Sequence, residues 1–395
     1  MLKIKNISYM LLYMFALNFM NMESRIILLL FLVIVIWKEK GKINITKNAI
    51  IILLFSFTFY GISTIYHSEM ITFYVLPYLG GPFMGYVCGY VMMKYNRNNP
   101  SVHLKKIIYI IIFGRFTHGA LNFFASHGYK NVIRNGNDFW TKSVIAATGQ
   151  GALITMMISL LFYSIFILKK NQIVEKYLVI SCVFFSALNN FKSASRTAIL
   201  IMIIVFLVCF IYMVFISKES IKKKIVFLLM FLMCTFTCVV SYNYDLINVR
   251  TKWENTALYQ RINTSTDFEK GDENRKKMYV DAVKVGITHP FGDGTLNTAH
   301  NFWLDILKQT GWIPFTFCIW LTVNIVKNWL FIMKNKKTNR GLKYFLLSVN
   351  TAILINFAVE PIMKGMPYYF VSFCIIAGAM DRYIKIIRKE VRINE

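Results

Sequence analysis

The sequence predicts an all-α integral membrane protein with about twelve transmembrane helices and one large extracytoplasmic loop. Three observations support this prediction: apolar residues make up 56% of the 395-residue chain, they fall into long runs, and charged residues separate most of the runs. The formal charge is +26. Because Lys and Arg occur in short clusters between the runs, and not on one face among aromatic residues, we expect a lipid bilayer and no nucleic acid as partner.

The apolar runs place the expected spans in chain order. A membrane helix needs roughly 20 residues to cross about 30 Å of hydrocarbon. The first two runs are short, so residues 1–37 form either two spans or one interrupted span. The expected spans are 7–21, 23–37, 48–66, 70–93, 104–125, 143–168, 174–191, 196–217, 224–241, 312–333, 342–360 and 368–387.

The distribution of basic residues predicts the orientation. Lys and Arg in short loops are retained on the cytoplasmic side. Alternate loops are rich in these residues, as are both termini, and the rich loops are 38–47, 94–106, 169–176, 218–224 and 334–343. We therefore expect a multi-pass protein with both termini in the cytoplasm.

The long segment 242–311 is the expected extracytoplasmic loop. It divides the chain into residues 1–241, which hold spans one to nine, the loop itself, and residues 312–395, which hold spans ten to twelve and a cytoplasmic tail. Within it, Asp272 and Pro290 bracket a predicted helix, and a second short helix ends at Gly311. We expect Phe302, Trp303, Ile306 and Leu307 of the second helix to lie on the membrane surface.

His300 and Asn301 stand at the start of that second helix, behind the tight turn "THPFGDG". Unpaired backbone N–H groups at a helix N-terminus attract anions. A neutral imidazole, with an ordinary pKa near 6.5, is a suitable proton acceptor at ambient pH. A lone His is also commonly a packing or surface residue, so this position alone leaves both interpretations open.

Several charged residues lie in or beside the apolar runs, where charge is costly. Arg115 is inside a run, Arg196 opens a run on the outer side, and Arg134 lies in an outer loop. Each either binds an anionic substrate or contacts lipid headgroup phosphates. Arg275 is a candidate in the long loop, and Glu360, at the outer end of a span, is a candidate second acid or base.

The sequence gives no sign of a cofactor or metal site. All seven Cys lie within apolar runs. Cys234 and Cys238 share a helix face, but no His or acidic residue beside them completes a metal site. Walker, dinucleotide-binding, HExxH and Asp-x-Asp motifs are missing from the sequence. We expect no cofactor and no metal.

Four motifs occur in a characteristic order. "SRTA" (Ser195–Ala198) opens an outer-side span, the long loop contains Arg275, "HPFGDG" (His289–Gly294) follows, and "HNFWLDILKQTG" (His300–Gly311) precedes a span. This order resembles the O-antigen ligase and polymerase superfamily, whose members are twelve-span inner-membrane glycosyltransferases. They use polyisoprenyl (undecaprenyl)-pyrophosphate-linked glycans outside the cytoplasm. The resemblance therefore implies a location in the cytoplasmic (inner) membrane of a bacterial cell.

The resemblance implies roles for individual residues. His300 matches the loop His of the family, Arg196 its span-opening Arg and Arg275 its loop Arg, so these three are the candidate catalytic residues. Arg134 is a looser match to an Arg-x-x-Gly-like stretch before a span, because the Asn that often follows this stretch in the family is not obvious here. With Arg134, the candidate substrate-binding residues are Asn301, Arg115 and Glu360.

The resemblance predicts a metal-independent polymerase that joins lipid-linked repeat units into O-antigen or capsular polysaccharide, in lipopolysaccharide or capsule biosynthesis. The donor and the acceptor are undecaprenyl-pyrophosphate-linked glycans, and a chain-length regulator is a further expected partner. An O-antigen ligase that moves glycan to the lipid A core is the alternative within the family. A lipid-linked glycan flippase or transporter is the alternative outside it, although the sequence shows no internal repeat.

Overall fold

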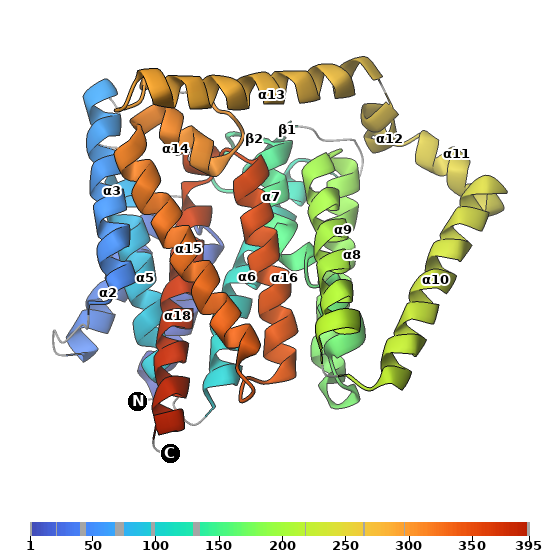
Figure 1. Ribbon diagram of the computed structural model, residues 1–395, viewed down its shortest axis with the longest axis horizontal. Coiled ribbons are helices and arrows are strands. Elements are labelled where there is room, and N and C mark those ends of the chain that lie inside the picture. Colours follow the sequence, from blue (N-terminus) through green and yellow to red (C-terminus); the bar gives the residue numbers. More distant parts are fainter. Residues whose placement is uncertain are drawn as a thin grey trace.

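The computed structural model describes residues 2–20, 22–39, 45–67, 75–95, 99–128, 135–217, 219–263, 265–295 and 297–392. These residues are almost entirely helical, with one short hairpin (Figure 1). The helices of the bundle are α1 (Leu2–Ala16), α2 (Met22–Lys38), α3 (Lys47–Tyr66), α5 (Gly81–Met92), α6 (Pro100–Ala125), α7 (Ala147–Ile158), α8 (Ile173–Lys192), α9 (Arg196–Ile211), α10 (Ile221–Asn243), α15 (Trp312–Lys334), α16 (Arg340–Val359) and α18 (Pro367–Arg392).

Shorter elements connect the bundle helices or lie across their ends. The ends of α7 and α9 continue into the wider turns η3 (Tyr163–Ile167) and η5 (Tyr212–Ile216). The other elements are η1 (Val75–Gly80), η2 (Met93–Tyr95), β1 (Asn135–Asn137), β2 (Val144–Ala146), η4 (Lys170–Gln172), η6 (Leu246–Asn248), α11 (Val249–Glu254), α12 (Ala257–Asn263), α13 (Ser265–Thr288), α14 (Phe302–Thr310) and α17 (Ile362–Gly365).

The prediction of an all-helical membrane protein is confirmed. Eight helices within the described residues are long and apolar enough to cross a membrane: Lys47–Tyr66, Pro100–Ala125, Ala147–Ile167, Ile173–Lys192, Arg196–Ile216, Ile221–Asn243, Trp312–Lys334 and Arg340–Val359. Each of the other four predicted ranges also overlaps a helix, but α1, α2, α5 and α18 do not meet the same combined standard of length and hydropathy. The count of twelve spans therefore stays a prediction.

The centre of the bundle is the close contact between α5 and α18. A Cβ atom added to Gly89 would lie 1.9 Å from the carbonyl oxygen of Ile375, and one added to Gly378 would lie 2.0 Å from that of Tyr86. These glycines therefore let the two backbones touch. At the other extreme, α10 stands apart at the edge of the bundle (Figure 1), and only 6% of its most apolar window is buried.

The loop between α10 and α15 covers one end of the bundle. In Figure 1, α13 lies across the helix ends, whereas both chain termini lie at the opposite end. The predicted loop helix is longer than expected, because α13 begins at Ser265 and not near Asp272. The predicted second helix is α14, and Gly311 ends it with a φ of +79°.

The apolar face of α14 points into the protein, and the expectation of a membrane-surface helix is wrong. Phe302 and Ile306 are fully buried, and Leu307 is 3% exposed. The Phe302 ring packs on Phe357 of α16 and Phe370 of α18, at centroid distances of 4.4 and 5.2 Å. The bundle itself offers an apolar partner for α14, so this helix does not have to reach the lipid.

Candidate functional site

The turn before α14 is held in place by close contacts. The Tyr66 hydroxyl at the end of α3 donates a hydrogen bond to the Gly292 carbonyl oxygen (2.8 Å). Gly292 has a φ of +81°, and an added Cβ would lie 2.5 Å from the Gln309 carbonyl group. Only glycine fits this conformation and this space. The turn thus anchors the far end of α14 against the bundle.

Asn301 caps the N-terminus of α14. Its side-chain oxygen accepts hydrogen bonds from the backbone N–H groups of Trp303 (3.2 Å) and Leu304 (3.1 Å), as an N-cap residue does. Its side-chain NH₂ group donates to the carbonyl oxygen of Ala358 at the end of α16 (3.0 Å). Asn301 therefore fixes the position of His300, and its role in substrate binding stays a prediction.

His300 is held in an uncommon backbone conformation directly before this cap. Its φ is +54°, in the left-handed region that few non-glycine residues adopt. The side chain is half-buried, and its Nδ1 atom has no hydrogen-bond partner among the described residues. Burial, together with the nearby Arg275 cation, lowers the pKa of His300 below its ordinary value. The imidazole is therefore neutral at pH 7 and has a nitrogen available to bind a proton or a ligand.

Arg275 extends from α13 toward the same place. Its positive charge adds to the effect of burial in lowering the pKa of His300, and it opposes the effect of burial on the pKa of Glu360. One helical turn further along α13, the Tyr279 hydroxyl donates to the Ala358 carbonyl oxygen (3.5 Å). This face of α13 therefore lies over the junction between α14 and the end of α16.

Glu360 is the buried acid of the cluster. It directly follows α16 and is 1% exposed. Burial raises its pKa to about 7, although a hydrogen bond with the Thr197 hydroxyl and the charge of Arg275 act in the opposite direction. Its Oε2 atom is buried and finds no partner in the part of the chain that the structure describes. Near neutral pH this carboxyl group can therefore both donate and accept a proton.

The structure thus brings together residues that are far apart in the sequence. Thr197 comes from the start of α9, Arg275 from α13, His300 from the cap of α14 and Glu360 from the end of α16. We call these four residues the His300 cluster. It combines a neutral base, an acid with a pKa near 7 and a cation, a combination suited to proton transfer beside an anionic group.

Arg196 lies beside this cluster in the sequence and in the fold. It is the first residue of α9, next to Thr197, and its side chain is partly exposed. The preceding residue, Ser195, is buried and packs against α7, where a Cβ added to Gly151 would lie 3.0 Å from its hydroxyl oxygen. Arg196 therefore begins α9 at the end of the bundle where α13 lies, as predicted from the sequence.

Arg115 is not exposed to lipid headgroups, so the interpretation as a headgroup contact is wrong. It is 5% exposed in the middle of α6. Its Nη2 group donates to the Tyr368 carbonyl oxygen (2.5 Å) and the Ser372 hydroxyl (2.9 Å) of α18, and the guanidinium lies 5.8 Å from the Phe15 ring centroid. These contacts tie α6 to α18. No contact in the described part of the chain joins Arg115 to His300, and its proposed substrate contact stays a prediction.

Asp305 is a buried acid near His300 in the chain that the sequence analysis did not single out. It is 2% exposed in the first turn of α14, and its Oδ1 atom accepts a hydrogen bond from the Ala299 backbone N–H (2.5 Å). Burial raises its pKa to about 7 against this bond and the nearby Lys308. Its Oδ2 atom has no partner within the described ranges. The sequence signal was an acid three residues after Phe302, on the apolar face of the helix.

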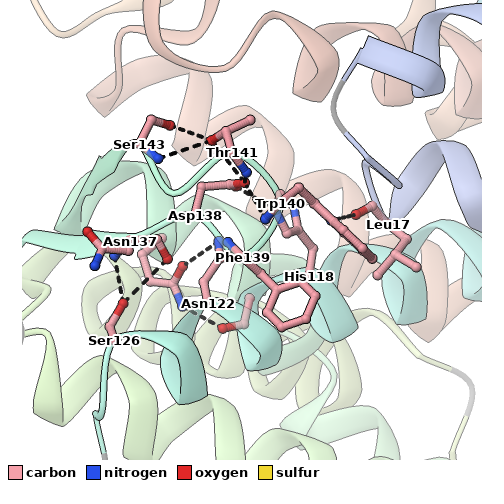
Figure 2. A network of polar contacts seen from close by, with 12 residues as sticks. Leu17, His118, Asn122, Ser126, Asn137, Asp138, Phe139, Trp140, Thr141 and Ser143 are labelled. Atoms are coloured by element: carbon pink, nitrogen blue, oxygen red, sulfur yellow. Dashed lines mark hydrogen bonds and ion pairs between the residues drawn. The ribbon is translucent and has the colours of Figure 1, made fainter.

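A second polar network holds the loop between α6 and α7 (Figure 2). His118 Nε2 donates to Asp138 Oδ2 (2.8 Å), and the other carboxylate oxygen accepts from the backbone N–H groups of Trp140 and Thr141. Burial raises the pKa of Asp138, but the bond from His118 and the backbone bonds outweigh it and lower the pKa to about 2. Asp138, Trp140 and Thr141 lie in the turn that joins β1 and β2, which is part of this loop. The candidate residue Arg134 lies in it but outside the described residues.

Among the residues that the structure describes, no group of three or more His, Cys, Asp or Glu side chains lies close enough together to hold a metal ion. No model of a known protein family matches the sequence, and no curated protein matches it.

Proposed function

We propose that this membrane protein is a glycosyltransferase that joins polyisoprenyl-pyrophosphate-linked oligosaccharide repeat units into a polysaccharide outside the cytoplasm. The observation that carries the proposal is the His300 cluster. Four segments of the chain meet there, and the buried Nδ1 of His300 and Oε2 of Glu360 have no partner among the described residues. Buried polar atoms are normally paired, so these two are available to a substrate.

The proposed reaction needs a proton acceptor and cations. The acceptor hydroxyl oxygen attacks the anomeric carbon of the donor sugar, the bond from this carbon to the pyrophosphate oxygen breaks, and its electron pair leaves with the lipid pyrophosphate. The hydroxyl proton passes to His300, whose lowered pKa keeps it neutral at pH 7. Arg275 and Arg196 hold the negative charge that develops on the pyrophosphate, because guanidinium groups pair with phosphate oxygens in a two-pronged manner.

The protein is also proposed to cross the membrane twelve times with both termini in the cytoplasm. Two features support this orientation. The termini lie together at the end opposite α13 (Figure 1), and the turns rich in Lys and Arg alternate with poorer ones along the chain. On this topology the His300 cluster faces the outside, where a lipid-linked glycan is presented.

The topology is tested with single Cys residues in a variant that lacks the seven native ones. Cys at the exposed position 274 on α13 is expected to react with a membrane-impermeant thiol reagent in spheroplasts. Cys at the exposed position 337, in the turn between α15 and α16, is expected to react only after the membrane is opened. The reverse labelling pattern would invert the topology and overturn the site assignment.

The activity is tested with purified protein in liposomes that contain a polyisoprenyl-pyrophosphate-linked repeat unit. Formation of products with several repeat units supports the polymerase. Transfer of the glycan only to an added lipid A core acceptor would indicate the ligase, and movement of the lipid-linked unit between leaflets without a new glycosidic bond would indicate a flippase. Either of the last two outcomes overturns the polymerase proposal.

A further inference from the structure

A large cleft opens at the end of the bundle opposite the His300 cluster. Its volume is about 990 Å³, and it lies between the end of α9 with η5, the end of α15 and the start of α16. Its walls are mainly apolar and are formed by Val208, Ile211, Leu330, Met333 and Leu347. A cleft of this size and lining is suited to hydrocarbon.

The mouth of the cleft is basic. Lys334, Lys336, Arg340 and Lys343 line it, against a single carboxylate from Glu219, so four positive charges face one negative charge. Glu219 is itself paired with Arg340 (2.7 Å) and Lys223 (3.6 Å). The Lys334 and Lys336 side chains are exposed at the rim. The mouth therefore favours an anionic group.

A smaller cleft of about 350 Å³ lies on the other side of Arg340. Phe166, Met213, Val226 and Phe227 form its apolar wall, and Lys222 and Lys223 add two more cations. Arg340 thus stands between two apolar clefts with basic rims. Two neighbouring apolar channels that share one cationic group match the shape of a lipid with two acyl chains and one phosphate.

A Trp side chain also lies in the wall of the larger cleft. Trp329 lines it, and the buried indole Nε1 has no partner in the described part of the chain. Trp is typical of the membrane interface, where its N–H group meets the polar part of the lipid. Trp329 therefore marks the depth at which the polar part of a lipid would lie in the cleft.

We propose that these two clefts form a binding site for an anionic glycerophospholipid from the adjacent leaflet. The acyl chains occupy the apolar clefts, and the phosphate lies against Arg340 and the lysines of the rim. Basic pockets between transmembrane helices bind anionic lipid headgroups in this way. A two-pronged guanidinium contact adds directionality to the general attraction.

The site has a consequence for the opposite end of the molecule. The lipid contacts α9 and α16, and the outer ends of the same two helices carry Thr197 and Glu360. A lipid that fixes the spacing of α9 and α16 therefore also stabilises the arrangement of the His300 cluster. The binding itself does not depend on the proposed glycosyltransferase activity, and its test measures lipid binding only.

The experiment measures lipid binding to the purified full-length protein by native mass spectrometry, with thermal unfolding as a second readout. Phosphatidylglycerol is expected to remain bound and to raise the unfolding temperature, whereas phosphatidylcholine of the same chain length binds more weakly. Equal binding of both lipids would overturn the proposal. Glycerol 3-phosphate, which lacks acyl chains, is expected to have no effect at the same concentration, and an equal effect would show a soluble-anion site instead.

Variants distinguish lipid binding in the clefts from nonspecific attraction of the lipid to surface cations. Each cation near a membrane surface contributes roughly fivefold to binding of an anionic lipid, so Lys334→Gln with Lys336→Gln should weaken phosphatidylglycerol binding about 30-fold. Lys337→Gln, an adjacent exposed residue that does not line the cleft, should leave binding unchanged. Leu330→Trp should fill the apolar part and displace the lipid without removing charge. Equal losses in Lys337→Gln and the double variant would refute the site.

Discussion

Two buried polar clusters in this protein differ in how their hydrogen-bonding groups are used. Around Asp381 of α18, the carboxylate accepts hydrogen bonds from the Asn48 side chain (2.8 Å), the Tyr86 hydroxyl and the Asn328 side chain. Both carboxylate oxygens are therefore paired. Around His300, by contrast, the buried atoms His300 Nδ1 and Glu360 Oε2 have no partner among the described residues.

The difference separates a structural cluster from a candidate site. A buried polar group without a hydrogen bond costs roughly 1–3 kcal/mol, so a protein keeps such groups mainly where something else uses them. The Asp381 cluster joins α3, α5, α15 and α18 and leaves no oxygen of this carboxylate for a ligand. We expect substitutions in the Asp381 cluster to lower stability and those in the His300 cluster to lower activity.

The largest expected effect follows from His300→Ala. Loss of a general base typically lowers a rate by about 10²- to 10⁴-fold, so chain extension should fall by at least about 100-fold. Because Nδ1 has no partner in the described part of the protein, the unfolding temperature should hardly change. The measurements are chain extension in liposomes and thermal unfolding in detergent.

His289→Ala is the matched control for His300. His289 lies in the exposed turn, where its Nδ1 atom is hydrogen-bonded to the Thr288 hydroxyl (2.8 Å). This variant should retain most of the activity. Normal chain extension by the His300→Ala protein would show that the His300 imidazole has only a structural role.

Asp381→Ala should have the opposite effect. It leaves the donors of Asn48, Tyr86 and Asn328 without their common acceptor. The Tyr86 hydroxyl retains its hydrogen bond with the Thr46 hydroxyl. Each of the two amide donors left unpaired costs about 1–3 kcal/mol, so the total loss of stability should be roughly 2–6 kcal/mol. The activity of each molecule that remains folded should be close to that of the wild type, as measured by chain extension per unit of folded protein.

Asp281→Ala is a suitable comparison for Asp381. Asp281 forms an ion pair with Lys308 (2.6 Å), but its side chain is 52% exposed. Half of the Asp281 side chain contacts water, whereas Lys308 is only 11% exposed. Solvent weakens this half-exposed pair, so the variant should lose about 1 kcal/mol, less than Asp381→Ala. An equal loss of stability in both variants would contradict the assignment of Asp381 as a buried structural anchor.

Glu360→Gln should make the protein more stable above pH 7 and less active. The pKa of Glu360 is raised from 4.5 to about 7 by burial, so the folded protein binds this proton more tightly than the unfolded chain. Its contribution to stability is therefore greatest below about pH 4.5 and decreases as the pH rises to about 7. The neutral Gln avoids this loss, which amounts to about 3 kcal/mol above pH 7.

Thermal unfolding of wild type and Glu360→Gln at pH 5 and pH 8 provides the measurement. The two proteins should differ at pH 8 and converge toward pH 5. Glu254→Gln on α11, outside both clusters, should follow the wild type at both values. A Glu360→Gln protein that is less stable than the wild type at pH 8 would show that the carboxylate is well compensated in the folded state.

The sequence was informative where local structure determines the site. Asn301 and Gly311 predicted the two ends of α14 correctly, because caps and stops act within a few residues. The sequence could not predict that Glu360 meets Thr197 and Arg275, since that contact depends on how four distant segments pack.

The spacing of apolar residues also could not show whether the apolar face of α14 packs on lipid or on protein. The stripe that contains Phe302 and Ile306 is the same whether the helix lies on lipid or on protein, and here the partner is α16 with α18. For the same reason Asp305 was missed: its burial follows from the packing of α14 and not from its neighbours in the sequence. Long-range packing, therefore, decides which polar residues lose contact with water.

The smallest expected effect tests how Arg275 acts on the substrate. Lys at this position keeps the positive charge but loses the planar guanidinium that pairs with two phosphate oxygens. One lost charge-assisted hydrogen bond corresponds to about tenfold in rate, so Arg275→Lys should reduce chain extension about tenfold without a change in unfolding temperature. Lys276→Arg, at the exposed neighbouring position, is the control and should behave like the wild type. If Arg275→Lys is fully active, the positive charge alone is sufficient. Arg275 then acts on His300 and Glu360 through its electric field and not through two-pronged hydrogen bonds to the pyrophosphate.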